Sequence, residues 1–195
     1  MNQYQKTTEK KQQAIIQAAL RLFKDKGFKQ TSIKSIAEAA EVSPVSIYNY
    51  FGSKDNLVAP CVNDLFEEIT QQAEDILNSN LDFKTKLDHA FALCQEKMSQ
   101  QISDYFQDKM VEDSVFSTLL TKAITAKKRD IYRAYIHLGK AEGLIAEDLS
   151  TELILNVMDA LNGMGNQLAH SDNLETEVEQ IHQIFLYGIL GKKKS

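Results

Sequence analysis

The chain has no tryptophan and only two prolines and two cysteines among its 195 residues. Cys61 and Cys94 form neither a CxxC pair nor a Cys/His cluster, which argues against a disulfide framework and a zinc site. No run of about 18 apolar residues is present, and the first residues lack the apolar segment of a signal peptide. We therefore expect free thiols, no membrane span and a cytoplasmic location.

Common catalytic patterns are also missing. The four histidines, at positions 89, 137, 170 and 182, do not have metal-ligand spacing. There is no Ser/His/Asp arrangement, glycine-rich phosphate loop or paired-carboxylate motif. We expect neither enzyme activity nor a bound metal or cofactor.

Charge is unevenly distributed along the chain. The net charge is −5, yet residues 1–60 carry nine Lys/Arg against five Asp/Glu, whereas residues 61–195 carry thirteen against twenty-two. The first segment is therefore +4 and the remainder −9. A basic segment on an acidic protein is typical of a nucleic-acid contact confined to one part of the chain.

Apolar residues recur at helical spacing almost throughout, and no sustained alternation indicates strands. The pattern predicts an all-α chain. It begins with a helix over about 8–26 that ends at Gly27, and a short helix capped by Thr31 or Ser32. A third helix is expected from Pro44 to about residue 51, with Ser43 as its cap.

The remaining two thirds should contain longer helices. One follows Ser53 and bends at Pro60, because a proline beyond the first turn removes a backbone hydrogen bond. Asp82 is expected to cap the next helix, which carries inward residues as far as Met98. Further helices are expected over about 102–110, 115–142, 153–168 and 178–188.

Two short helices joined by residues 41–43 form a helix-turn-helix, whose second helix fits the DNA major groove. The segment TSIKSIAEAAEVSPVSIYNYFGSKDNL, residues 31–57, resembles the TetR family signature, as do the preceding AALRLF and Gly27-Phe28. The resemblance covers about the first sixty residues. It implies a three-helix DNA-binding domain over 1–52 and a larger helical ligand-binding and dimerisation domain over 53–195.

The resemblance also implies roles for single residues. Thr31 or Ser32, together with Lys54, would hold phosphates, and Lys34 would reach a base edge. The outward positions of the third helix complete the predicted DNA-binding set: Pro44, Val45, Ser46, Tyr48, Asn49 and Tyr50. Ile47 and Phe51 are four apart and should be buried. An alternative for Tyr48 and Tyr50, an aromatic corner of the small core, stays open.

Glu41 departs from the family, which usually has glycine in this turn. A left-handed backbone at a residue other than glycine would cost roughly 1 kcal/mol. A carboxylate near phosphates is also unfavourable, unless it points away or pairs with Lys34 or Lys54. We therefore expect modest operator affinity at high salt.

In the family, the last two helices pair with those of a second subunit, and the apolar stripes here agree with that arrangement. The predicted dimer interface consists of Val157, Leu161, Met164, Ile181, Ile184, Phe185 and Gly188. Alternatively, these stripes complete the core of one subunit. The middle helices would enclose a largely apolar ligand pocket lined by Phe66, Phe91, Met98, Tyr105, Phe106, Met110, Phe116, Leu120, Tyr132 and Asn162. Each of these residues can equally be plain core.

These patterns predict a DNA-binding transcriptional regulator, a homodimeric repressor that leaves a palindromic operator when a small, largely apolar ligand binds. The alternative is an architectural DNA-binding protein of the same fold without an effector. For release we hypothesise that the helix after Ser53 pivots near Pro60 and moves the DNA-binding domain. A static kink at Pro60 is the competing explanation.

Overall fold

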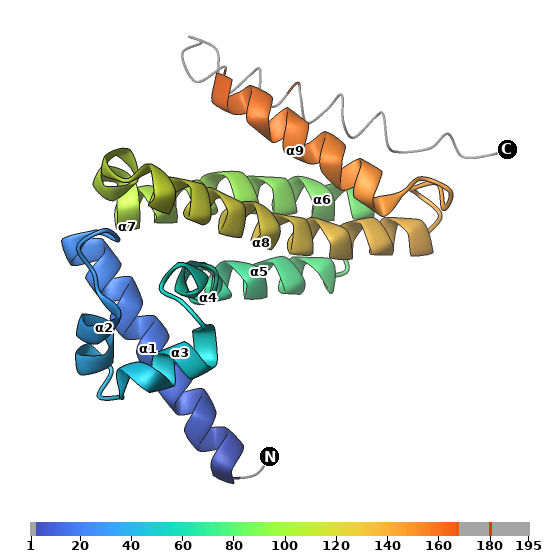
Figure 1. Ribbon diagram of the computed structural model, residues 1–195. Coiled ribbons are helices and arrows are strands. Elements are labelled where there is room, and N and C mark those ends of the chain that lie inside the picture. The colour runs from blue at the N-terminus through green and yellow to red at the C-terminus, as the bar shows by residue number, and fades with distance from the viewer. Residues whose placement is uncertain (1–2, 168–179, 181–195) are drawn as a thin grey trace, which may run out of the picture. The chain divides into compact units, whose positions relative to one another are not determined.

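The computed structural model describes residues 3–167 and residue 180, and within these residues all regular structure is helical (Figure 1). This confirms the all-α prediction. In chain order the elements are α1 (Gln3–Lys26), α2 (Ile33–Ala39), α3 (Pro44–Phe51), the 3-10 turn η1 (Asp55–Leu57), α4 (Val58–Leu65), α5 (Glu67–Leu77), α6 (Phe83–Ala92), the π-helical segment η2 (Leu93–Lys97), α7 (Met98–Glu112), α8 (Ser114–Ala141) and α9 (Thr151–Gln167). Among the described helices, none is both long and apolar enough to cross a membrane.

Contacts divide the chain into two compact units. The first consists of residues 1–73 and 91–127, and the second of residues 74–90 and 128–195. The first unit thus combines the three N-terminal helices with α4, α7 and the first half of α8. The functional boundary expected at residue 52, between a DNA-binding domain and a ligand-binding and dimerisation domain, is not the same as this structural division and stays a prediction.

The first unit is organised around α1, which contacts α2, α3, α4 and α7. Its apolar stripe is buried as expected, with Ile15, Ala19 and Phe23 almost fully inaccessible. Gly27 ends the helix in a left-handed conformation, at φ 81°, and its N–H donates to the Phe23 carbonyl at 3.1 Å. The predicted stop of α1 is confirmed, because glycine reaches this conformation without steric cost.

The expected single helix beyond Ser53 is instead two helices that meet at Phe66, where φ is −101° and ψ is 14°. Pro60 is the third residue of α4, and a proline in the first turn removes no intrahelical hydrogen bond. The bend predicted at Pro60 is therefore wrong. At the actual break, the Leu65 carbonyl accepts a hydrogen bond from Gln101 Nε2 of α7 at 2.8 Å.

Helical structure continues from Phe83 to Glu112 through the π-helical segment, where separate helices were expected. Its start was predicted correctly, since the Asp82 carboxylate accepts from the Thr85 N–H at 3.1 Å and from its hydroxyl at 2.6 Å. These two hydrogen bonds lower the pKa of Asp82. The inward residues Cys94 and Met98 are buried, as the periodicity indicated.

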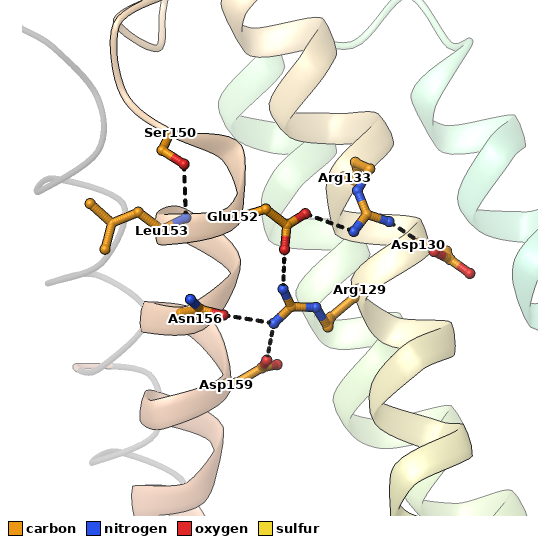
Figure 2. Close-up of polar contacts among 8 residues, drawn as sticks. All are labelled: Arg129, Asp130, Arg133, Ser150, Glu152, Leu153, Asn156 and Asp159. Carbon is orange, nitrogen blue, oxygen red and sulfur yellow. Dashed lines mark hydrogen bonds and ion pairs between the residues drawn. The ribbon is translucent and has the colours of Figure 1, made fainter.

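In the second unit, α9 is fastened to α8 by an ionic network, drawn in Figure 2. Arg129 donates to Glu152 at 2.6 Å, to Asn156 at 3.1 Å and also to Asp159. Arg133 donates to the other oxygen of Glu152 at 3.0 Å. One face of α9 is thereby fixed against α8.

Candidate DNA-binding surface

Side-chain caps start both helices of the helix-turn-helix. Ser32 Oγ accepts from the Ser35 N–H at 3.0 Å, and Ser35 Oγ accepts from the Ser32 N–H at 3.1 Å, which makes a capping box. Ser43 Oγ accepts from the Ser46 N–H at 3.2 Å, and Pro44 occupies the first position of α3. The sequence predicted both starts from the same local chemistry.

The turn between α2 and α3 contains the left-handed residue that was anticipated, because Glu41 has φ 54°. Two hydrogen bonds close it: Val42 N–H donates to the Ala37 carbonyl at 3.0 Å, and Glu41 N–H to the Glu38 carbonyl at 3.3 Å. This pair is a Schellman motif, which normally has glycine at the Glu41 position. The motif forms without glycine, at a cost of about 1 kcal/mol in backbone strain.

The third helix presents a mixed apolar and polar face to solvent. Ile47 is fully buried, whereas Val45 is 63% and Tyr48 54% exposed. Pro44 and Asn49 are exposed as well, and Ser46, Tyr50 and Phe51 are half-buried. The exposure of Tyr48 disfavours the alternative in which it forms an aromatic corner of the core. Phe51, expected inside, lies at the margin, with its ring edge-on to that of Tyr50 at 6.3 Å.

Thr31 differs from its predicted place on the DNA-facing surface. Its side chain is only 2% exposed, and its hydroxyl lies 2.8 Å from the Gly27 carbonyl and 3.2 Å from the Leu22 carbonyl. The neighbouring Ser32 is exposed, and so is Lys34. Of the two alternatives for the start of the second helix, Ser32 is the one that faces solvent.

Lys54 also points into the protein. Its ammonium donates to the Phe28 carbonyl at 2.8 Å and to the Thr31 carbonyl at 3.0 Å. The same nitrogen lies 4.2 Å from the centroid of the Phe28 ring, in the geometry of a cation–π contact. The sequence contained no local signal for these partners, because they come from the loop between α1 and α2.

Most residues of the predicted ligand pocket are buried: Phe66, Phe91, Met98, Phe106, Phe116, Leu120 and Tyr132. Tyr105 is half-buried, and the side chains of Met110 and Asn162 lie outside the described part of the structure. Phe106 and Phe116 meet edge-on at 5.3 Å. Tyr132 and Asn162 belong to the second unit, and the other eight residues belong to the first.

A groove of about 460 Å³ in the first unit is lined by Ile69 and otherwise by polar residues that no motif indicated. One wall of the groove is α5, which contributes Glu68 and Gln72. The other wall is the segment around Lys97 and Gln101. Inside it, Lys97 donates to Gln72 at 2.6 Å. The predicted pocket residues do not line this groove.

The predicted dimer interface is only partly within the described residues. Val157 of α9 is 43% exposed, and Leu153, one turn earlier, is 57% exposed. In Figure 2, Leu153 points away from α8. The side chains of Leu161 and Met164, and the whole of Ile181, Ile184, Phe185 and Gly188, lie outside the described part.

The two cysteines are buried free thiols, as expected. Burial, and to a smaller extent the nearby Asp64 carboxylate, raise the pKa of Cys61 far above its ordinary range, so the group stays a protonated thiol. Its S–H lies 3.7 Å from the Ile16 carbonyl. Among the described residues, no cluster of His, Cys, Asp and Glu is suited to hold a metal ion.

A capped pair of short helices, a tight turn and an outward-facing second helix define a helix-turn-helix DNA-binding domain. Comparison with known proteins agrees, because residues 15–61 match the family model described as bacterial regulatory proteins, tetR family. Residues 15–61 are therefore a DNA-binding domain of the tetR family, and the chain is a DNA-binding transcriptional regulator.

Relatives and solved structures of this kind match most of the chain. The HTH-type transcriptional repressor KstR2 of Rhodococcus jostii is 23% identical over 144 residues, which is 71% of this chain and 70% of KstR2. The structure of Thermus thermophilus FadR, a TetR family repressor in complex with lauroyl-CoA, has a TM-score of 0.60 at 21% identity, covering 93% of this chain and 96% of FadR. A TetR regulator of Haloarcula marismortui has a TM-score of 0.52 at 19% identity, covering 93% and 98%. At these identities the structures show the common fold.

Proposed function

We propose that the protein is a transcriptional repressor that binds a palindromic operator as a homodimer and leaves it when a small molecule binds the larger helical region. The observation that carries this proposal is α3, a rigidly capped helix whose outward face combines exposed Tyr48, Asn49 and Val45 on the basic part of the chain. Such a face suits base edges in the major groove. The relative KstR2 is itself named a repressor.

Within this proposal, residues 1–52 bind DNA and residues 53–195 bind ligand and partner. Ser32 and Lys34 would contact the DNA from the start of α2. Base readout would come from the face of α3, through Pro44, Val45, Ser46, Tyr48, Asn49 and Tyr50. Thr31 and Lys54 are left out of this surface, because their polar groups are occupied inside the protein.

Dimerisation through α9 is supported by the face of this helix that carries Leu153 and Val157. Leu153 and Val157 are one turn apart, large, apolar and exposed, whereas the face toward α8 is ionic. Exposed apolar residues in register on a helix are typical of an interface with another helix. Two DNA-binding units, held at a fixed distance, could then read two half-sites.

For release, we propose that the pivot is the break at Phe66. α4 is fastened to α1, because the Asp64 carboxylate accepts hydrogen bonds from Gln17 at 2.6 Å and also from Gln13. It would therefore move together with the DNA-binding helices. The break that follows is bridged from α7 by the Gln101 side chain. A ligand that shifts α7 could change the angle there and so the distance between recognition helices.

The test is a selection of genomic fragments bound by the purified protein, followed by titration of the selected duplex with fluorescence anisotropy. Asn49→Ala and Ser46→Ala should change which bases are preferred, each by about 1–3 kcal/mol at the affected base pair. Exposed Glu147, far along the chain, supplies the control Glu147→Ala. If the α3 variants and the control have the same base preferences as the parent, the DNA-binding surface is wrongly assigned.

Release is tested by adding compounds to the protein–duplex complex. The panel includes acyl thioesters, because the FadR structure of the same fold contains lauroyl-CoA. One compound should dissociate the complex and raise the melting temperature of the free protein. Stable DNA binding that responds to no member of a broad apolar panel would favour the architectural alternative.

A further inference from the structure

We propose that Lys54 is a positioning residue for DNA recognition, not a phosphate ligand, and that it connects the helix-turn-helix to α8 through Phe28 and Phe116. The inference rests on the proposed DNA binding and deepens it, because it names an internal path between α8 and the recognition helix. Every residue involved belongs to the first compact unit.

Lys54 joins two parts of the DNA-binding domain. It lies three residues after the end of α3, and its ammonium donates to the Phe28 and Thr31 carbonyls in the α1–α2 loop. The Phe28 ring covers the same ammonium at 4.2 Å. Turning Lys54 toward a phosphate would break both hydrogen bonds and the ring contact, and this loss opposes such a movement.

The loop that Lys54 holds is itself fixed to α1. Buried Thr31 places its hydroxyl within hydrogen-bond distance of the Gly27 and Leu22 carbonyls at the end of that helix. The next residue, Ser32, caps α2. Lys54 thus ties the end of α3 to the start of α2, and the angle between the two helices depends on this tie.

Phe28 continues the path toward α8. Its ring stacks on Phe116 in the first turn of α8, with centroids 5.1 Å apart and planes at 14°. Phe116 also contacts Phe23 of α1 at 5.9 Å and Phe106 of α7 at 5.3 Å. We call these four residues the aromatic cluster.

A displacement of the first turn of α8 would reach the α1–α2 loop through this cluster. Phe116 and Phe28 are nearly inaccessible to solvent, and close-packed interiors transmit small shifts to their neighbours. Moving Phe116 would move Phe28, which supplies both a carbonyl and a ring to Lys54. The position of α8 would therefore affect the angle between α2 and α3.

The first experiment measures the salt dependence of binding to a duplex selected from a random pool. Lys54→Met should lower affinity about tenfold at every salt concentration, with an unchanged slope of log affinity against log salt. Exposed Lys34 is the control, since Lys34→Met should flatten that slope by about one unit if it contacts a phosphate. A loss of about one unit in Lys54→Met would overturn the inference. A parent protein that binds no selected duplex would instead overturn the proposed function, and this inference with it.

The second experiment is a double-mutant cycle between Lys54 and α8. Phe116→Leu should also weaken binding at unchanged slope, and adding Lys54→Met to it should cost less than Lys54→Met alone. Hydrogen exchange should become faster in residues 44–51 of each single variant. Phe116→Met replaces the first variant if that one does not fold.

The control for a general loss of stability is Ile69→Ala, because Ile69 is a buried residue of α5 outside the aromatic cluster. At a temperature where all variants are folded, this control should bind the duplex like the parent and combine additively with Lys54→Met. Additive effects in the Lys54–Phe116 cycle, or an equal loss of binding in the control, would overturn the proposed path.

Discussion

The guanidinium of Arg129 on α8 donates to the carboxylate of Glu152 on α9 at 2.6 Å, and both groups have further partners in the network of Figure 2. The Arg129 side chain is only 20% exposed, unlike that of most surface ion pairs. Isolated exposed pairs contribute little, but a shared arginine with several acceptors holds a defined geometry. This network orients α9, whose other face carries Leu153 and Val157.

Replacing this arginine should loosen α9. We expect Arg129→Met to lower the urea midpoint of unfolding and to weaken dimerisation measured by sedimentation, because Asp159 and Glu152 lose their shared donor. The control is Lys84→Met, which disrupts the exposed Lys84–Asp88 pair and should leave the dimer unchanged. If Arg129→Met dimerises as strongly as the parent, the ionic network does not contribute to dimerisation.

Acid should weaken the same network. Hydrogen bonds from Arg133 and then Arg129 lower the pKa of Glu152 from its ordinary value of 4.5. A carboxyl with a lower pKa in the folded state contributes stability that is complete above its unfolded pKa and disappears as pH falls through the folded one. Unfolding midpoints measured from about pH 6 to pH 3 should therefore fall less steeply for Glu152→Gln than for the parent. Equal slopes would contradict this role.

Glycine at position 41 should stabilise the turn. Glu41 is left-handed at φ 54°, and the strain that Glu41→Gly removes exceeds the entropy that glycine adds to the unfolded chain. We expect the free energy of unfolding to rise by roughly 0.5–1 kcal/mol. Glu38→Gly, inside α2, should have the opposite sign. A destabilised Glu41→Gly would mean that the carboxylate has a compensating partner.

A methyl group at Gly139 should destabilise the second unit. A Cβ there would lie 2.5 Å from Phe83 Cζ and 2.8 Å from Ile145 Cδ1, both in buried side chains. We expect Gly139→Ala to cost about 1–3 kcal/mol, measured by chemical denaturation. The exposed Glu142→Ala, one turn later, should change stability little.

Removing Pro60 should leave ligand-induced release unchanged, because this residue sits in the first turn of α4 and not at the break. Gln101→Ala should change the ligand concentration at which the operator is released, because it removes the hydrogen bond from Gln101 to the Leu65 carbonyl next to the break at Phe66. Anisotropy titrations of both variants test this. If ligand-induced release changes in Pro60→Ala but not in Gln101→Ala, the pivot lies at Pro60 and not at Phe66.

Features that depend on neighbours in the chain were predictable. The caps at Ser32, Ser43 and Asp82 and the glycine stop at Gly27 follow from side chains that bind backbone within about four residues. Helical periodicity likewise identified Ile47 as buried. The family signature added the identity of the domain, because its matching positions lie in one short segment.

Tertiary structure alone decided where Lys54 and Thr31 point and where the helix after Ser53 breaks. The acceptors of Lys54 are carbonyls more than twenty residues away, and they converge only after α1, α2 and α3 have packed. The break at Phe66 is bridged by Gln101, which comes from α7. The helices, their caps and the DNA-binding class could be predicted without the fold, because short-range interactions carry that information. A lysine that contacts DNA and a lysine that holds the recognition helix from within are the same residue type at the same position, so the sequence could not distinguish them. Long-range packing decides, because it brings the two carbonyls to Lys54.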